Sequence, residues 1–253
     1  MRKNLIKQKI QAGETVYGVF VNMYCPPIVE MLSLIGFDFV VIDAEHGPMS
    51  IENCENMVRA ADTVNITPIT RIAVNTQQNI LRYLDIGAAG VQMPMINCKA
   101  DAEAVVRAVK YPPEGRRGLA GVRAADYGLT RSLGDYVKEA NRETLVVVHV
   151  ETIEATKNLK ETLTVPAIDV VFIGPNDLSS SMGYPGQSDH PEVRKTIDGL
   201  VKEIRAAGKV AGTTAFDPDS LRKRREEGFQ YIAHAMGPIL AHSVRDYIAA
   251  ARE

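Results

Sequence analysis

Short apolar runs alternate with helical patterns along the whole chain. Each run is rich in Val and Ile, and the stretch that follows it repeats its apolar residues with the 3.6-residue period of a helix. Continuous apolar runs of this kind are typical of parallel strands that are buried on both faces. The predicted strands span residues 16–23, 38–44, 67–73, 90–96, 144–152, 169–175, 209–215 and 230–236.

Cap residues mark the ends of the predicted helices. Ser50, Thr76 and Asp217 stand where an N-cap is expected, and Pro218 follows at the first helical turn. Segment 112–128 reads as irregular, and a loop follows the sixth strand. The predicted helices span residues 1–14, 26–36, 50–64, 76–87, 99–111, 132–142, 152–163, 191–208, 217–228 and 238–253.

Eight strand–helix pairs in 253 residues predict an α/β fold, a (β/α)8 TIM barrel. The alternative is a doubly wound open sheet, which normally has a Gly-rich phosphate turn after its first strand. Here the first strand leads into "NMYCPP" instead. The composition does not change along the chain, so we expect a single domain over residues 1–253.

Composition excludes several function classes. Lys and Arg number 29 against 31 Asp and Glu, which gives a net charge of −2 and predicts no nucleic-acid partner. No apolar run is long enough for a membrane span, and the first residues lack the apolar stretch of a signal peptide. The three cysteines are widely spaced and show no zinc pattern. We therefore expect a cytoplasmic protein with no membrane partner.

Ionisable residues gather where the predicted strands end. In a TIM barrel the active site lies at the carboxyl ends of the strands. The amino ends carry only ordinary polar residues, whereas the carboxyl ends from several strands carry residues suited to chemistry. These are Asp43, Glu45, His46, Thr70, Arg71, His149, Glu151, Thr152, Gly174, Pro175, Asn176, Asp177, Thr213, Thr214 and His234.

Glu151 and Asp177 follow neighbouring strands and are candidate metal ligands. Two carboxylates that leave several positions for water or substrate suit Mg²⁺ or Mn²⁺. On spacing alone other interpretations stay open, because Asp177 could cap the next helix and Glu151 could form a salt bridge at the rim. His149 should face the same space as Glu151, since alternate strand residues share a face.

His46 and Arg71 are the candidates for proton transfer and charge stabilisation. Histidine has an ordinary pKa close to neutral pH, and Asp43 could orient the ring or share its charge. Arg71 suits a substrate carboxylate or a developing oxyanion, although it could also form a structural ion pair with Asp43 or Glu45. Within the irregular segment, residues 116–128 contain Arg116, Arg117 and Arg123 and read as a solvated loop or as a lid over an anionic substrate.

Two other mechanisms lack their residues. No lysine stands at the carboxyl end of any predicted strand, which argues against a Schiff base. The sequence also has no G-x-S-x-G elbow for a nucleophilic serine.

At these residues the chain resembles the HpcH/HpaI aldolase family, the metal-dependent (class II) pyruvate aldolases. The resemblance runs from about residue 37 to residue 215, in order and at natural spacings. The stretches that carry it are "FDFVVIDAEHGP", "TRI", "LRYLDIGAAGVQMPM", "AVKYPPEGRRG", "VHVETIEATKNL", "VFIGPNDLSSSMGYPGQSDHPEV" and the "GK" before the seventh strand.

The resemblance implies roles for particular residues. Glu151 and Asp177 would hold the divalent ion, Mg²⁺ or Mn²⁺, with Co²⁺ as a further candidate. Arg71 would contact the keto oxygen of pyruvate, and His46 would transfer the proton with support from Asp43. The remaining implied residues are Asp85, which reaches a neighbouring subunit's site, and the pyruvate-binding positions His149, Gly174, Pro175, Asn176 and Thr214.

The implied activity is a carbon–carbon lyase reaction. A 4-hydroxy-2-oxo acid would be cleaved to pyruvate, or a close 2-oxo acid, plus an aldehyde through a metal-stabilised enolate, and aldol addition is the reverse. Alternatives that share the enolate are an oxaloacetate decarboxylase, a macrophomate-synthase-like enzyme and an acyl-CoA lyase. The resemblance also implies a homotrimer or homohexamer in which the last helix packs on a neighbouring subunit.

The chain departs from the family pattern at His149. In the best-known relatives this position is a glutamine that touches the pyruvate oxygens. Histidine can still donate one hydrogen bond there, and it adds a titratable group. The departure leaves oxaloacetate or a hydroxypyruvate-type donor as alternatives to pyruvate.

Overall fold

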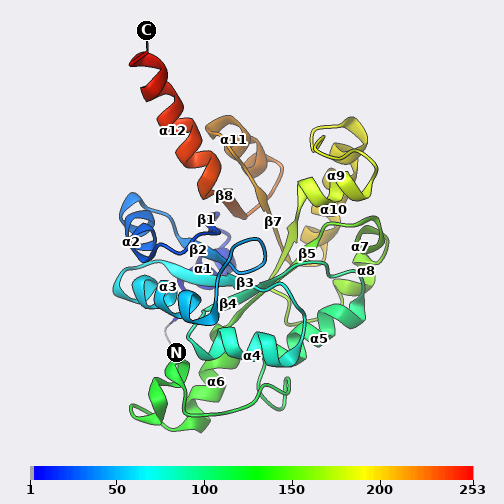
Figure 1. Ribbon diagram of the computed structural model, residues 1–253. Coiled ribbons are helices and arrows are strands. Elements are labelled where there is room, and N and C mark those ends of the chain that lie inside the picture. The colour runs from blue at the N-terminus through cyan, green and yellow to red at the C-terminus, as the bar shows by residue number, and fades with distance from the viewer. Residues whose placement is uncertain (1–2, 253) are drawn as a thin grey trace.

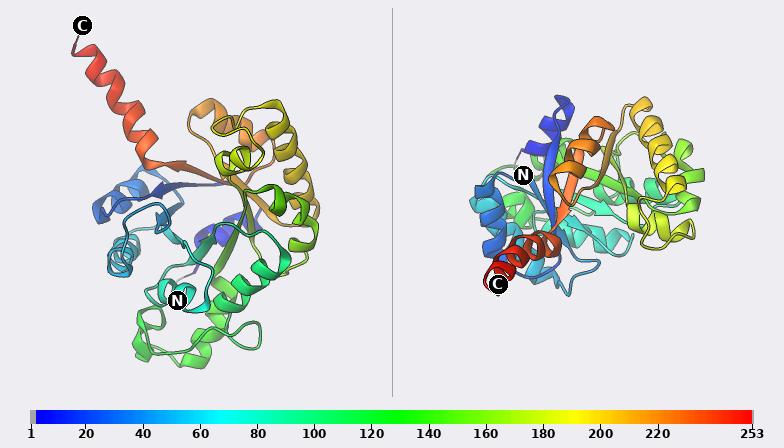
Figure 2. Two further views of the ribbon diagram at one scale, coloured as in Figure 1. Left: turned by 45° about the vertical axis from the view of Figure 1, so that its right-hand side comes forward. Right: turned by 90° about the horizontal axis from the view of Figure 1, so that it is seen from above.

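The computed structural model describes residues 3–252 and shows a closed barrel of eight parallel strands with helices around it (Figures 1 and 2). Each strand pairs with the next, and β8 closes the barrel against β1. This confirms the predicted TIM barrel and excludes the open sheet. The strands are β1 (Val16–Val21), β2 (Phe39–Asp43), β3 (Thr67–Arg71), β4 (Gly90–Met93), β5 (Leu145–Val150), β6 (Val170–Ile173), β7 (Val210–Thr214) and β8 (Tyr231–Ala235).

The helices lie close to their predicted positions, with three differences. A helix, α9, follows β6 where a loop was expected, the predicted helix over 152–163 is two short helices, and a 3₁₀ helix, η1, forms in the irregular segment. The helices are α1 (Leu5–Gln11), α2 (Pro26–Ile35), α3 (Ile51–Thr63), α4 (Gln77–Asp85), α5 (Lys99–Val109), η1 (Arg123–Gly128), α6 (Leu133–Glu143), α7 (Ile153–Lys157), α8 (Leu159–Thr162), α9 (Pro175–Ser181), α10 (Pro191–Ala206), α11 (Pro218–Glu226) and α12 (Met236–Ala250).

Two apolar layers hold the barrel together. One lies between the strands and the surrounding helices, and the other fills the barrel interior. In the interior Phe39 stacks on Tyr231 with 4.2 Å between ring centroids. A Cβ atom at Gly18 would lie 2.2 Å from the Phe39 ring, so only glycine leaves space for this pair. The large rings therefore fill a layer that a closed barrel would otherwise leave empty.

Helix α1 closes the amino end of the barrel. Asn4 is fully buried, and its side-chain amide donates to the carbonyl oxygens of Ala89 and Glu143 at 3.0 Å each. The Lys7 ammonium forms an ion pair at 3.0 Å with Asp169, the residue just before β6. Groups at the amino ends of the strands are thus bound by Asn4, the N-cap of α1, and by Lys7 within α1, which is a structural role.

Helix α12 projects away from the barrel (Figures 1 and 2). Its apolar side chains Leu240, Val244, Tyr247 and Ile248 are between 40% and 75% exposed. These side chains have no cover within the chain that the structure describes. Within residues 3–252, no helix combines the length and the apolar character that crossing a membrane requires.

Candidate active site

A cavity of about 390 Å³ opens at the carboxyl ends of the barrel strands. It brings together residues that are far apart in the sequence and that lie at or just after the carboxyl ends of β2, β3, β5, β6 and β7. Asp85, which the family resemblance implied for the site, does not line it. The predicted residues that line it are Asp43, His46, Arg71, His149, Glu151, Gly174, Pro175, Asn176, Asp177 and Thr214.

Arg71 is fixed at the cavity wall by two carboxylates and an aromatic ring. Its Nε and Nη2 donate to the two oxygens of Asp43 at 2.9 and 2.6 Å, and its Nη1 lies 3.3 Å from Glu45 Oε2. The guanidinium also lies 4.8 Å from the centre of the Phe20 ring. Burial would raise the pKa of Asp43, but the hydrogen bonds and charge of Arg71 outweigh it and hold that pKa below its usual value. The predicted ion pair and the predicted site position are therefore both present.

His46 lies on the turn after β2, with its side chain 63% exposed. Asp43 does not hold the imidazole ring as expected; its Oδ1 accepts the backbone N–H of His46 at 3.2 Å and so fixes the turn. The carboxylate close to the ring is that of Glu45, whose Oε2 lies 3.9 Å from His46 Nε2. Burial raises the pKa of Glu45 above its ordinary value, against the opposing charge of Arg71.

Glu151 follows β5 and is 4% exposed. Its Oε1 accepts the backbone N–H of Met95 at 2.8 Å, and its Oε2 contacts His149 Nδ1 at 2.8 Å. Burial pushes the pKa of Glu151 up, but His149, the Met95 amide and the charge of Arg71 together hold it below its ordinary value. Glu151 is therefore a buried carboxylate inside the cavity and not a salt bridge at the rim.

Asp177 lies in the first turn of α9 and lines the same cavity. The N-cap of α9 is Gly174, and no side chain caps this helix, so Asp177 does not have the capping role left open above. A Cβ atom at Gly174 would lie 2.6 Å from Glu151 Oε2, so the glycine keeps space for that carboxylate.

The donor set fits a hard divalent cation that keeps most of its water. Residues 3–252 contain no group of three or more His, Cys, Asp or Glu side chains that could hold a metal. Mg²⁺ commonly binds through only one or two carboxylates and completes its shell with water and substrate. Glu151 and Asp177, which both line the cavity, match that pattern, whereas a zinc-type cage does not.

His149 is 1% exposed, and both of its ring nitrogens are occupied by protein groups. Nδ1 contacts Glu151, and Nε2 lies 2.8 Å from the side-chain nitrogen of Gln92 on β4. The ring stacks on Phe172, with 4.7 Å between ring centres. The expected common face of His149 and Glu151 is confirmed.

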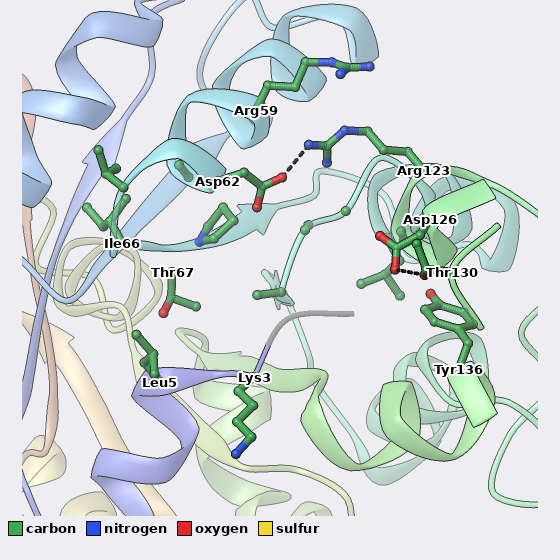
Figure 3. A pocket seen from close by; sticks show the side chains of 18 of the residues that line it. Lys3, Leu5, Arg59, Asp62, Ile66, Thr67, Arg123, Asp126, Thr130 and Tyr136 are labelled. Carbon is green, nitrogen blue, oxygen red and sulfur yellow. Dashed lines mark hydrogen bonds and ion pairs between the residues drawn. The ribbon is translucent and has the colours of Figure 1, made fainter. Parts of the chain in front are cut away.

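Asp85 lies at the end of α4 and accepts a hydrogen bond from Arg117 at 2.9 Å. Arg117 lines a second cavity, of about 460 Å³, at the amino ends of β3 and β4. Figure 3 shows this cavity, where Arg123 of the irregular segment pairs with Asp62. Segment 116–128 therefore does not form a lid over the carboxyl-end cavity of its own chain.

Sequence reasoning missed three residues around the site. Glu45 was noted as ionisable, but the proximity of its carboxylate to the His46 ring was not predicted. Gln92 and Tyr231 are buried inside the barrel, and Tyr231 donates to Gln92 Oε1 at 3.0 Å. A polar Gln in an apolar strand was the available signal, because a buried amide requires partners.

Fold and cavity together define a (β/α)8-barrel enzyme whose acidic site lies at the carboxyl end. The family model described as HpcH/HpaI aldolase/citrate lyase matches residues 16–240, and the chain belongs to this family. Its named relatives are aldolases, so the chain is a carbon–carbon lyase that carries out aldol cleavage or addition, as expected.

Two relatives and one solved structure show how far the similarity extends. The chain is 35% identical to a 2-keto-3-deoxy-L-rhamnonate aldolase of Salmonella gallinarum, over 94% of this chain and 88% of the relative. It is also 35% identical to a hydroxypyruvate/pyruvate aldolase of Roseobacter denitrificans, over 92% and 91%. A crystal structure of an HpcH/HpaI aldolase/citrate lyase family protein from Burkholderia cenocepacia superimposes with a TM-score of 0.93 at 30% identity, covering 99% of this chain and 100% of that chain.

Proposed function

We propose that the chain is a metal-dependent aldolase that cleaves 4-hydroxy-2-oxo acids to pyruvate, or a close 2-oxo acid, plus an aldehyde. The observation that supports this most is that Glu151, Asp177, Arg71 and His46 line one cavity. That set combines two hard oxygen ligands, a fixed cation and a proton-transfer group. Relatives named as a 3-deoxy-2-keto acid aldolase and a hydroxypyruvate/pyruvate aldolase agree with a 2-oxo acid substrate.

Glu151 and Asp177 would hold the divalent ion, Mg²⁺ or Mn²⁺. When bound, the ion supplies Lewis-acid stabilisation of the negative charge that develops on the 2-oxo group. Arg71 supplies a second positive contact for the same charge, and Asp43, Glu45 and Phe20 hold it in place. Pre-organisation of this kind stabilises the transition state without moving side chains during the reaction.

The substrate carboxylate would lie against the turn after β6. Gly174, Pro175 and Asn176 line the cavity there, with Thr214 at the end of the neighbouring strand β7. Thr214 Oγ1 is buried and has no hydrogen-bond partner among the described residues. A buried hydroxyl without a partner is costly, and a substrate oxygen would satisfy it.

His46 would remove the proton from the 4-hydroxyl group during cleavage and return it during addition. Its exposed ring lies at the cavity rim, where an aldehyde fragment would leave, and Glu45 lies close enough to stabilise a charged imidazole. The C3–C4 bond then breaks to give an aldehyde and the enolate of the 2-oxo acid. Protonation of that enolate completes the turnover.

We also propose a homotrimer or homohexamer in which α12 packs on a neighbouring subunit. The exposed Leu240, Val244, Tyr247 and Ile248 on a projecting helix support this assembly. In the assembly Asp85 would reach the neighbour's site and would no longer pair with Arg117. The cytoplasm suits this enzyme, because Cys25, Cys54 and Cys98 are free thiols.

Activity measurements with and without metal test the proposal. Pyruvate and a panel of aldehydes are incubated with EDTA-treated enzyme and then with added Mn²⁺ or Mg²⁺. We expect product only with metal, and full activity in excess EDTA would reject the metal dependence. A parallel reaction with oxaloacetate separates the aldolase from a decarboxylase: faster release of CO₂ than aldol cleavage would favour the decarboxylase.

Mixing two inactive variants tests the shared site. Arg71→Ala and Asp85→Asn subunits, each inactive alone, should recover part of the activity when they reassemble together. No recovery, with mixed oligomers present by mass spectrometry, would remove Asp85 from the neighbour's site.

A further inference from the structure

A line of hydrogen bonds runs through the barrel interior to Glu151. Tyr231 Oη donates to Gln92 Oε1 at 3.0 Å, and Gln92 Nε2 lies 2.8 Å from His149 Nε2. His149 Nδ1 lies 2.8 Å from Glu151 Oε2. These contacts connect β8, β4 and β5 to a carboxylate in the candidate active site.

The chemistry of the first two groups sets the direction of the line. The Gln92 amide presents its oxygen to Tyr231 and its nitrogen to His149, and because an amide oxygen only accepts, the buried Tyr231 hydroxyl donates its hydrogen to Gln92. An amide nitrogen only donates, so His149 Nε2 must accept. The ring hydrogen then lies on Nδ1, where it is donated to Glu151 Oε2.

Stacking holds the members of the line in place. The His149 ring lies on Phe172 with 24° between the ring planes, and the Tyr231 ring lies on Phe39 at the same angle. Gln92 is fully buried. The Met95 backbone N–H binds the other oxygen of Glu151, so both carboxylate oxygens have a fixed donor and each keeps a lone pair for a ligand.

We propose that Tyr231, Gln92 and His149 are positioning residues that fix the orientation of the Glu151 carboxylate. His149 then acts through Glu151 rather than on substrate oxygens, because both of its ring nitrogens are occupied. The inference rests on the proposed function only for the role of Glu151 as a ligand. Mutation of an outer residue that orients a metal ligand commonly lowers the affinity for the metal by 10- to 100-fold.

Nitrogen NMR of the metal-free enzyme tests the line directly. The protein is labelled with ¹⁵N-histidine, and the His149 signals are assigned by their loss in His149→Gln. We expect a neutral ring with its hydrogen on Nδ1. In Tyr231→Phe and Gln92→Met the Nε2 contact is loosened, and both tautomers should appear. Tyr111→Phe removes another buried phenol and should leave the His149 signals unchanged.

Three NMR results would overturn the proposal. They are a wild-type His149 with its hydrogen on Nε2, a ring with hydrogens on both nitrogens, and variant spectra identical to wild type. Tyr231→Phe removes a single oxygen, so it decides the question even if Gln92→Met does not fold.

Mn²⁺ binding, followed by electron paramagnetic resonance, tests the link to Glu151. Gln92→Met should weaken Mn²⁺ binding by about tenfold or more, with no change in Tyr111→Phe. Altered tautomers with unchanged affinity would overturn the link between His149 and Glu151. A wild-type enzyme that binds no Mn²⁺ would reject the proposed metal site, whereas the metal-free NMR result would still decide the hydrogen-bond line.

Discussion

Arg71 and Asp43 form two parallel hydrogen bonds, at 2.9 and 2.6 Å, between the ends of neighbouring strands β3 and β2. The planar guanidinium matches the carboxylate in this geometry, so the pair fixes the plane of the cation as well as its position. The guanidinium therefore reaches the cavity in one orientation.

Arg71→Lys should lower kcat by about 100-fold or more, because an ammonium group cannot form the two parallel hydrogen bonds to Asp43 or the planar contact with Phe20. Steady-state kinetics with a 4-hydroxy-2-oxo acid measures the effect. Arg59→Lys is the matched control, since Arg59 forms a salt bridge with Glu55 on α3, away from the site. A wild-type kcat in Arg71→Lys would assign Arg71 to structure alone.

Gly174→Ala should weaken metal binding and activity together, because the new Cβ atom would meet Glu151 Oε2 at 2.6 Å. Backbone strain does not contribute, since the φ of Gly174 is −85°. Titration with Mn²⁺ should show an affinity lower by about tenfold. Gly199→Ala, in α10 with open space around it, serves as control. Equal affinities in wild type and Gly174→Ala would show that the carboxylate tolerates displacement.

His46→Asn should lower kcat by about 100- to 10,000-fold, the usual contribution of a positioned acid–base group. Thermal stability should change little, because the ring is 63% exposed and asparagine keeps the backbone N–H that Asp43 binds. His190→Asn, at the N-cap of α10, is the control. An active His46→Asn enzyme would show that a group other than His46 transfers the proton.

Lys110 makes stability depend on pH. Burial, with a contribution from Lys7, lowers its pKa to about 8, while its ammonium donates to the carbonyl oxygens of Asn141 and Thr144. Between about pH 8 and pH 10.5 the unfolded chain therefore binds more protons at this residue than the folded chain does. The contribution of Lys110 to the free energy of unfolding should rise across that window, by on the order of 3 kcal/mol.

Urea unfolding of wild type and Lys110→Met at pH 7 and pH 10 measures this rise. The wild type should gain stability relative to Lys110→Met as pH increases, whereas Lys195→Met, at an exposed position, should follow the wild type. Parallel pH curves for wild type and Lys110→Met would contradict the lowered pKa.

Local sequence was enough to predict the barrel, since each strand is a buried apolar run and a helical pattern follows it. Helix α9 escaped prediction because "GPNDLSSS" has the composition of a turn, although Pro175 suits a first helical position. The contacts of His149 escaped for another reason. Gln92 and Tyr231 meet only because the closed barrel sets β4 and β8 at one interior level, which no local pattern records.

The contacts among residues at the rim of the cavity could be predicted from the sequence only in part. Asp43 and His46 are three residues apart, and their proximity suggested a carboxylate–imidazole contact. The turn instead directs the backbone N–H of His46 to Asp43 and places Glu45 beside the ring. A tight turn after a strand decides such contacts, and here the turn is tied to the end of β3, because the Ala44 N–H donates to the carbonyl oxygen of Arg71 at 3.0 Å.

The placement of α1 matters for anyone who handles this enzyme. Because Asn4 is anchored beneath the barrel floor, an affinity tag or surface linker fused ahead of Lys3 emerges on the side opposite the reaction chamber. Enzyme immobilised on beads through that end would keep its substrate entrance facing the solution.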